Sequence, residues 1–237
     1  MKSSKEIFEK LKTKLIVSCQ AEGESPFNSP DGVALFAKAA IQGGAAGIRS
    51  EGIEKTKMIL NETRVPVIGL SKSYFSDGYV RITGSIAEVE SLINIGSHIV
   101  AIDGTFRKRE GLTGPEFINK VKENYKCLIM ADISTEKEAV ECQDAGADCI
   151  STTLNGYTPE TIDDKVCGPN YMLLKTLVSL LKVPVFAEGR INTPEAAAEM
   201  IKKGAWSVVA GSAITRPALI TQWYIEAMNK VLSQYAD

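Results

Sequence analysis

Eight short apolar runs recur along this chain, and a helical pattern follows each of them. The runs are rich in β-branched residues and do not alternate polar with apolar positions, which is typical of strands buried on both faces in a parallel sheet. Eight such strand–helix units predict an α/β fold, the closed (β/α)8 TIM barrel. The predicted strands are 15–20, 46–50, 66–72, 98–103, 127–132, 148–153, 184–189 and 206–212.

Helical patterns fill the gaps between these runs, and no linker or low-complexity stretch interrupts them. The length of 237 residues matches the roughly 200–250 residues of many one-domain barrels. We therefore expect residues 1–237 to form a single TIM-barrel domain. The predicted helices are 31–42, 51–62, 86–95, 115–125, 135–145, 171–182, 194–203 and 217–235.

A glycine follows every second helix, at Gly44, Gly96, Gly146 and Gly204. Glycine at this point supplies the left-handed backbone conformation that ends many helices. The recurrence indicates a weak quarter-barrel repeat of two strand–helix units, although the loops of any barrel use similar punctuation. Both interpretations predict the same fold.

Composition excludes several classes of protein. The chain has 27 Lys and Arg against 29 Asp and Glu, a net charge of −2, so we expect no nucleic-acid or anionic-membrane partner. No apolar run approaches the roughly 20 residues that span a bilayer, and the start of the chain lacks a signal-peptide core. Five cysteines without a CxxC motif argue against a disulfide framework. We expect a cytoplasmic protein.

His98 is the single histidine of the chain. One histidine excludes multi-histidine metal sites and most catalytic zinc arrangements, and the sequence contains no clear metal cluster. His98 also begins the run 98–103, the wrong end of a barrel strand for catalysis. Glycine-rich nucleotide loops are absent as well.

Each predicted strand ends in a polar residue or a glycine. In barrel enzymes these carboxyl ends meet around one active site. Lysine, arginine and carboxylates without a histidine suit proton transfer beside a carbonyl group, or Schiff-base formation. The strand ends are Gln20, Arg49, Lys72, Asp103, Asp132, Thr152 with Thr153, Glu188, and Gly211 with Ser212.

The ends of the last two strands predict a phosphate site. Gly189, and Gly211 with Ser212, allow backbone N–H groups to approach an anion, and the last predicted helix opens at Arg216-Pro217, where its N-terminal dipole favours an anion. Arg190 and Arg216 follow closely, and guanidinium groups pair with phosphate through two hydrogen bonds.

Seven segments, in chain order, resemble one family. They are 15–21 (LIVSCQA), 47–49 (GIR), 67–72 (VIGLSK), 131–134 (ADIS), 152–158 (TTLNGYT), 187–190 (AEGR) and 211–217 (GSAITRP). Together they resemble the N-acetylmannosamine-6-phosphate 2-epimerases, a family of the ribulose-phosphate-binding barrel superfamily. The resemblance spans residues 15–217, while the loop at 159–170 matches no motif of the family.

The resemblance implies 2-epimerisation of N-acetylmannosamine 6-phosphate to N-acetylglucosamine 6-phosphate in bacterial sialic-acid breakdown. It implies a homodimer that uses neither a metal nor an organic cofactor. Lys72 matches the family's catalytic lysine and Glu188 its partner carboxylate, acting either as the acid on the opposite face or by orienting the reacting hydroxyls. The substrate-binding positions are Gln20, Arg49, Asp132 and Arg216, to which we add the strand end Thr153.

Three alternatives remain open at this stage. A lysine Schiff-base aldolase would use the same Lys72 on a similar phosphosugar. A non-catalytic phosphosugar-binding barrel would bind without proton exchange, and a different ribulose-phosphate-binding enzyme would share only the scaffold. Two long loops, 73–84 and 154–170, are candidates for functional segments; the first has room for a small hairpin.

Overall fold

Eight parallel strands close into a barrel in this computed structural model, which describes residues 4–162 and 168–233. The last strand pairs with the first, with Val208 opposite Leu15. The predicted (β/α)8 barrel is confirmed. Its strands are β1 (Leu15–Cys19), β2 (Gly47–Glu51), β3 (Val67–Leu70), β6 (Ile99–Asp103), β7 (Ile129–Asp132), β8 (Cys149–Ser151), β9 (Val185–Glu188) and β10 (Ser207–Ala210).

The helices between the strands begin at capping residues. Ser29 accepts a hydrogen bond from the N–H of Gly32 at 3.0 Å, and Thr135 forms a reciprocal capping box with Glu138. None of the described helices is both long and apolar enough to cross a membrane. These helices are α2 (Pro30–Gln42), α3 (Ile53–Glu62), α4 (Ile86–Asn94), α5 (Gly114–Asn124), α6 (Glu136–Asp144), α7 (Tyr171–Leu180) and α8 (Pro194–Lys202).

The four repeat glycines have the predicted backbone conformation. Their φ angles are +98° at Gly44, +90° at Gly96, +96° at Gly146 and +96° at Gly204. A side chain is strained in this region, which explains why glycine recurs where these helices end. The middle of the loop predicted at 154–170, with Cys167, and the last two residues of the helix predicted at 217–235 lie outside the described residues.

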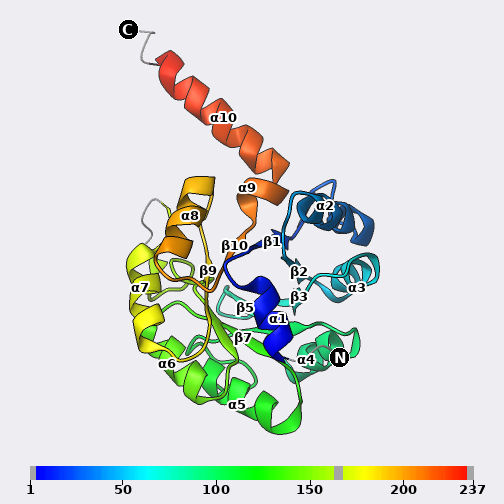
Figure 1. Cartoon of the computed structure of the whole chain (residues 1–237), viewed down its shortest axis with the longest axis vertical. Helices are drawn as coiled ribbons and strands as arrows, with labels where there is room; N and C mark the ends of the chain where they lie inside the picture. The colour runs from blue at the N-terminus through cyan, green and yellow to red at the C-terminus, as the bar shows by residue number, and fades with distance from the viewer. Residues whose placement is uncertain (1–3, 163–167, 234–237) are drawn as a thin grey trace.

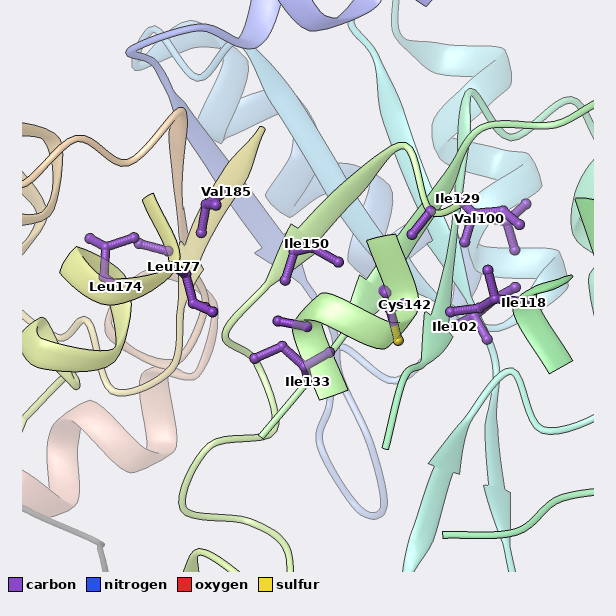
Figure 2. Close-up of a cluster of buried hydrophobic side chains, with 14 of the residues drawn as sticks. Val100, Ile102, Ile118, Ile129, Ile133, Cys142, Ile150, Leu174, Leu177 and Val185 are labelled. Carbon is purple, nitrogen blue, oxygen red and sulfur yellow. The ribbon is translucent and has the colours of Figure 1, made fainter. Parts of the chain in front are cut away.

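An apolar layer joins helices α4 to α8 to the outer face of the barrel. Figure 2 shows Ile129 and Ile150 from neighbouring strands facing Ile118, Cys142 and Leu177 from the helices, all of them completely buried. Each buried aliphatic side chain of this size contributes about 1.5–3 kcal/mol to folding. The layer fixes the strands rigidly and so fixes the positions of the residues at their ends.

An N-terminal helix that the sequence analysis did not predict, α1 (Ser4–Leu11), closes one end of the barrel. Ile7 and Leu11 are buried against barrel residues such as Ile16 and Phe186, and α1 crosses the centre of the ring of strands in Figure 1. The four-residue spacing of Ile7 and Leu11 is the helical signal that the analysis overlooked. The opposite end of the barrel holds the carboxyl ends of the strands.

A two-stranded hairpin, β4 (Lys72–Tyr74) and β5 (Val80–Ile82), follows β3 and confirms the hairpin expected in the loop 73–84. Lys72 belongs to this hairpin, although we predicted it as the last residue of the strand 66–72. The N–H of Ser71 bonds the Thr83 hydroxyl at 3.2 Å instead of continuing the barrel ladder, so the barrel strand ends at Leu70.

The chain after β10 departs from the regular barrel pattern. A four-residue helix, α9 (Ser212–Thr215), precedes α10 (Pro217–Leu232), which has no buried residue. Figure 1 shows α10 extending away from the ring of strands. The predicted eighth helix is therefore present, but within one chain it does not cover the barrel.

Candidate active site

A cavity of about 650 Å³ opens at the carboxyl ends of the barrel strands. Among the residues that the structure describes, five cationic side chains line it against two carboxylates, Glu22 and Glu188, so this lining favours an anionic ligand. Ten of the eleven predicted site residues are among its lining: Gln20, Arg49, Lys72, Thr153, Glu188, Gly189, Arg190, Gly211, Ser212 and Arg216.

Asp132, the eleventh, lies behind the cavity wall and is completely buried. Its two carboxylate oxygens accept hydrogen bonds from Arg49 at 3.1 Å and 2.5 Å, a bidentate pair that fixes the plane of the guanidinium group. Arg49 Nη1 also lies 3.3 Å from Glu188 Oε2. The sequence predicts Asp132 among the substrate-binding residues; in the structure it lies one layer deeper and holds Arg49.

This buried cluster joins one positive charge to two carboxyl groups. Burial alone would lower the pKa of Arg49, but Asp132 and Glu188 raise it above its ordinary value. Burial raises the pKa of Asp132 and of Glu188, and Arg49 offsets this only in part. Because two carboxylates share one guanidinium, the cluster favours holding a proton.

A hydroxyl network connects the two carboxyl groups. Thr153 Oγ1 lies 2.8 Å from Asp132 Oδ1, 3.0 Å from Glu188 Oε2 and 2.8 Å from Ser151 Oγ. A hydroxyl carries one proton and donates to one acceptor at a time. Ser151 was missed by the sequence analysis, although it lies two residues before Thr153 and therefore on the same face of an extended segment.

Lys72 is paired with a carboxylate that the sequence analysis did not identify. Its Nζ forms a salt bridge with Oε1 of Glu22, in the loop between β1 and α2. Arg216 Nη2 lies 3.7 Å from the same oxygen. Burial acts to raise the pKa of Glu22, but Lys72 and Arg216 outweigh it and the pKa is lowered. No spacing pattern distinguishes Glu22 in the sequence.

The predicted phosphate-binding residues all line the cavity but differ in their side-chain contacts. Gly189 has a φ of +111°, a turn that glycine adopts readily. The guanidinium of Arg190 donates to the carbonyl oxygens of Gly168 at 2.7 Å and Asn155 at 2.8 Å. Arg190 therefore holds the loop after β8, whereas Arg216, with a half-exposed side chain, remains accessible at the rim.

Asp103 lies outside the cavity lining. It is buried and pairs with Arg107 at 2.8 Å and Arg109 at 2.9 Å. Arg107, which the sequence analysis missed, lines the cavity. His98 accepts a hydrogen bond from the N–H of Val67 at 3.2 Å, at the amino ends of the strands and away from the site, as predicted.

A family model for "Putative N-acetylmannosamine-6-phosphate epimerase", named NanE, matches residues 33–230 of this chain. Two relatives carry the name "Putative N-acetylmannosamine-6-phosphate 2-epimerase". The one from Clostridioides difficile strain 630 is 44% identical over 94% of this chain and 99% of its own length. The one from Caldanaerobacter subterraneus is 46% identical over 93% of both chains.

Solved structures agree with the sequence relatives. An N-acetylmannosamine-6-phosphate 2-epimerase from Clostridium perfringens superposes with a TM-score of 0.88 at 37% identity, covering 96% of this chain and 98% of the other. A thiamine phosphate pyrophosphorylase from Pyrococcus furiosus gives a TM-score of 0.59 at 20% identity, covering 88% and 89%, which supports the barrel fold alone. With a family model over most of its length and relatives above 40% identity, this chain belongs to the NanE family of N-acetylmannosamine-6-phosphate epimerases.

Proposed function

We propose that this protein interconverts N-acetylmannosamine 6-phosphate and N-acetylglucosamine 6-phosphate by removing and returning the proton at C2. The observation that carries the proposal is that Lys72 and Glu188 line one cavity with Arg216, in a member of an epimerase family. A base, an acid and an anion anchor are the groups that this reaction requires.

The phosphate anchors the substrate at the ends of β9 and β10. Arg216 pairs with it, and backbone N–H groups of the turns at Gly189 and Gly211–Ser212 add hydrogen bonds, since the first N–H groups of a helical turn have no acceptor within that turn. The excess of cationic side chains around the cavity supports this orientation. Anchoring at C6 leaves C1 and C2 to reach the other residues.

Lys72, as the neutral amine, removes the C2 proton from the open-chain aldehyde. The electron pair of the broken C–H bond forms a C1–C2 double bond, and the carbonyl electrons move to the C1 oxygen to give an enolate whose C2 carries the acetamido nitrogen. Arg49 and Gln20 stabilise the sugar oxygens by hydrogen bonding, and Asp132 keeps Arg49 in position. Positioned proton transfer of this kind contributes about 10²–10⁴-fold to a rate.

Glu188, as the carboxylic acid, returns a proton to the opposite face of C2 while the carbonyl re-forms. The raised pKa of Glu188 supports this role, because burial and the nearby Asp132 favour its protonated form. Thr153 and Ser151 orient the carboxyl group through their hydroxyls. The cycle closes when Lys72 loses its proton to solvent and Glu188 regains one.

Proton NMR of N-acetylmannosamine 6-phosphate incubated with the protein in D₂O tests this function directly. We expect N-acetylglucosamine 6-phosphate to accumulate with deuterium at C2, because the returned proton comes from solvent-exchanged groups. Product that keeps its C2 hydrogen would contradict proton abstraction. Smaller carbonyl products would indicate an aldolase, and an unchanged substrate spectrum a non-catalytic binding protein.

We also propose that the reaction needs no metal ion. Within residues 4–162 and 168–233, no three His, Cys, Asp or Glu side chains are placed together to hold one, and the steps above use only side chains of the chain. Dialysis against EDTA should therefore leave kcat unchanged within about twofold. Loss of a metal ion that contributes several kcal/mol would lower kcat by far more than that. Loss of activity that one divalent cation restores would contradict this expectation.

We further propose that the protein is a homodimer in which each α10 covers the barrel of the other copy. A groove of about 410 Å³ lies where a barrel's eighth helix normally packs, lined by apolar residues of β1, α8 and β10 that include Leu15, Ile201 and Val208. The unpacked α10 exposes apolar side chains over much of its length: Tyr224, Ile225, Met228, Val231 and Leu232. Exchange of identical helices would bury both surfaces.

Replacing Ile225 and Met228 by aspartate should convert the dimer to monomers, because each buried apolar contact of this size contributes about 1.5–3 kcal/mol. Sedimentation equilibrium at micromolar concentration measures the mass directly. Glu226→Gln, on the same exposed helix, is the matched control and should remain dimeric. A wild-type protein with the mass of one chain would refute the homodimer.

A further inference from the structure

Glu22 is the one carboxylate in the described part of the chain that contacts both the proposed base and the proposed phosphate anchor. It pairs with Lys72 Nζ, and its Oε1 lies 3.7 Å from Arg216 Nη2. The other acidic residue of the cavity lining, Glu188, instead pairs with Arg49. Glu22 therefore joins two residues that have different tasks in the proposed reaction.

Substrate phosphate and the Glu22 carboxylate require the same partner. A phosphate bound to Arg216 would lie beside Oε1 of Glu22, and two anions at such a distance repel each other. The side chain of Glu22 is 39% exposed, so it can leave the cavity without exposing buried apolar surface. The binding of one anion thus opposes the binding of the other.

The residue before Glu22 is held in place. Lys55 Nζ donates to the Ala21 carbonyl oxygen at 2.9 Å and lies 3.3 Å from Glu51 Oε2. After Glu22, Gly23 has a φ of +56° and open space around it. The backbone is therefore anchored on one side of Glu22, which keeps the carboxylate near the cavity. The open space around Gly23 leaves room for the Glu22 side chain to move when its ion pairs are broken.

We propose that Glu22 is a positioning residue that acts as an internal counter-ion, holding Lys72 and Arg216 together in the free enzyme and giving way to the substrate phosphate. The inference rests on the proposed function, because it assigns the phosphate to Arg216. Displacement of Glu22 removes the negative charge in contact with the Lys72 ammonium group and so favours the neutral amine. Binding of a phosphosugar thereby prepares the base.

The balance of charge around Lys72 supports this sequence of events. Once Glu22 withdraws and the phosphate is paired with Arg216, the other charged side chains that the described residues contribute to the lining are three arginines and one carboxylate, and the arginines disfavour the positive charge of a protonated Lys72. Within residues 4–162 and 168–233, the charged side chains that line the cavity besides Lys72 and Glu22 are Arg49 from β2, Arg107 after β6, Glu188 from β9, Arg190 after β9, and Arg216 before α10.

Steady-state kinetics of Glu22→Gln with N-acetylmannosamine 6-phosphate test the inference. Since a partly exposed ion pair changes an equilibrium by about fivefold at most, we expect KM to fall about threefold and the acidic limb of the kcat/KM profile to move about half a pH unit lower. Glu24→Gln removes the same charge from the same loop, outside the cavity lining, and should match the wild type. Glu22→Asp should restore part of the wild-type KM.

Titration calorimetry with inorganic phosphate provides a readout independent of turnover. Glu22→Gln should bind phosphate about threefold more tightly than the wild type and Glu24→Gln, because Arg216 no longer has an internal partner. Equal phosphate affinity in all three proteins would overturn the inference, as would a fall in kcat for Glu22→Gln with KM unchanged. If the wild type shows no epimerisation, the proposed function fails, while the phosphate titration still decides the competition at Arg216.

Discussion

Replacing Lys72 by alanine is expected to lower kcat for epimerisation by about 10²–10⁴-fold, the range that a positioned general base contributes. Phosphosugar binding should persist, because Arg216 and the turns after β9 and β10 are unchanged. The exchange of the C2 proton in D₂O measures the chemical step, and titration calorimetry measures binding. An alanine variant that exchanges the C2 proton at the wild-type rate would refute the assignment of Lys72 as the base.

Lys57→Ala is the matched control for this variant. Lys57 is exposed on α3, so its loss should leave kcat unchanged. Borohydride treatment of the wild type with substrate separates the epimerase from a Schiff-base enzyme, since only an imine is trapped covalently. A stable adduct on Lys72 would favour the aldolase alternative.

Replacing Arg49 by methionine is expected to lower the free energy of unfolding by about 3–5 kcal/mol, the usual effect of removing one partner of a buried ion pair. Arg49 is the single cation of its cluster, bonded to Asp132 and facing Glu188. Without it, two buried carboxyl groups lose their counter-charge. Urea denaturation followed by circular dichroism measures the change, with Arg64→Met, at an exposed arginine, as the control.

The effect of Arg49→Met should depend on pH in a defined direction. Burial already raises the pKa of Asp132 and Glu188, and removal of the guanidinium raises both further. A carboxyl group with a higher pKa in the folded state binds protons on folding, so stability falls as the pH rises from the unfolded pKa to the folded one. The loss relative to wild type should therefore be larger at pH 8 than at pH 5; the opposite trend, or a stability equal to that of Arg64→Met, would contradict this account.

The barrel was predictable because its signals are local and repeated. Apolar runs mark the strands, capping residues such as Ser29 and Thr135 mark helix starts, and Gly44 and its three counterparts mark helix ends. The path of α10 was not predictable in the same way. Its sequence forms a helix wherever it packs, and nothing in a helical pattern states whether the helix returns to its own barrel.

The site was predictable to the extent that it lies at strand ends. Arg49, Thr153 and Glu188 come together because parallel strands place their carboxyl ends on one rim. Contacts between loops escaped prediction, since Glu22 reaches Lys72 across 50 positions of sequence. The depth of Asp132 also escaped prediction. The sequence places this residue at a strand end, but it does not show that Arg49 from another strand binds it through a bidentate pair in the assembled barrel.

The location of Lys72 on the β4–β5 hairpin separates the proposed base from the frame that carries the other groups. The hairpin is joined by three residue pairs, and it is held to the rest of the molecule by Ile82 in the core and by the Ser73–Glu88 hydrogen bond rather than by the barrel ladder. Small movements of the Lys72 amine therefore need not break any backbone hydrogen bond between the barrel strands that carry Arg49 and Glu188. The position of the amine is therefore set by the hairpin, whose turn is held by the ion pair of Asp77 with Arg81, and not by the strands of the ring.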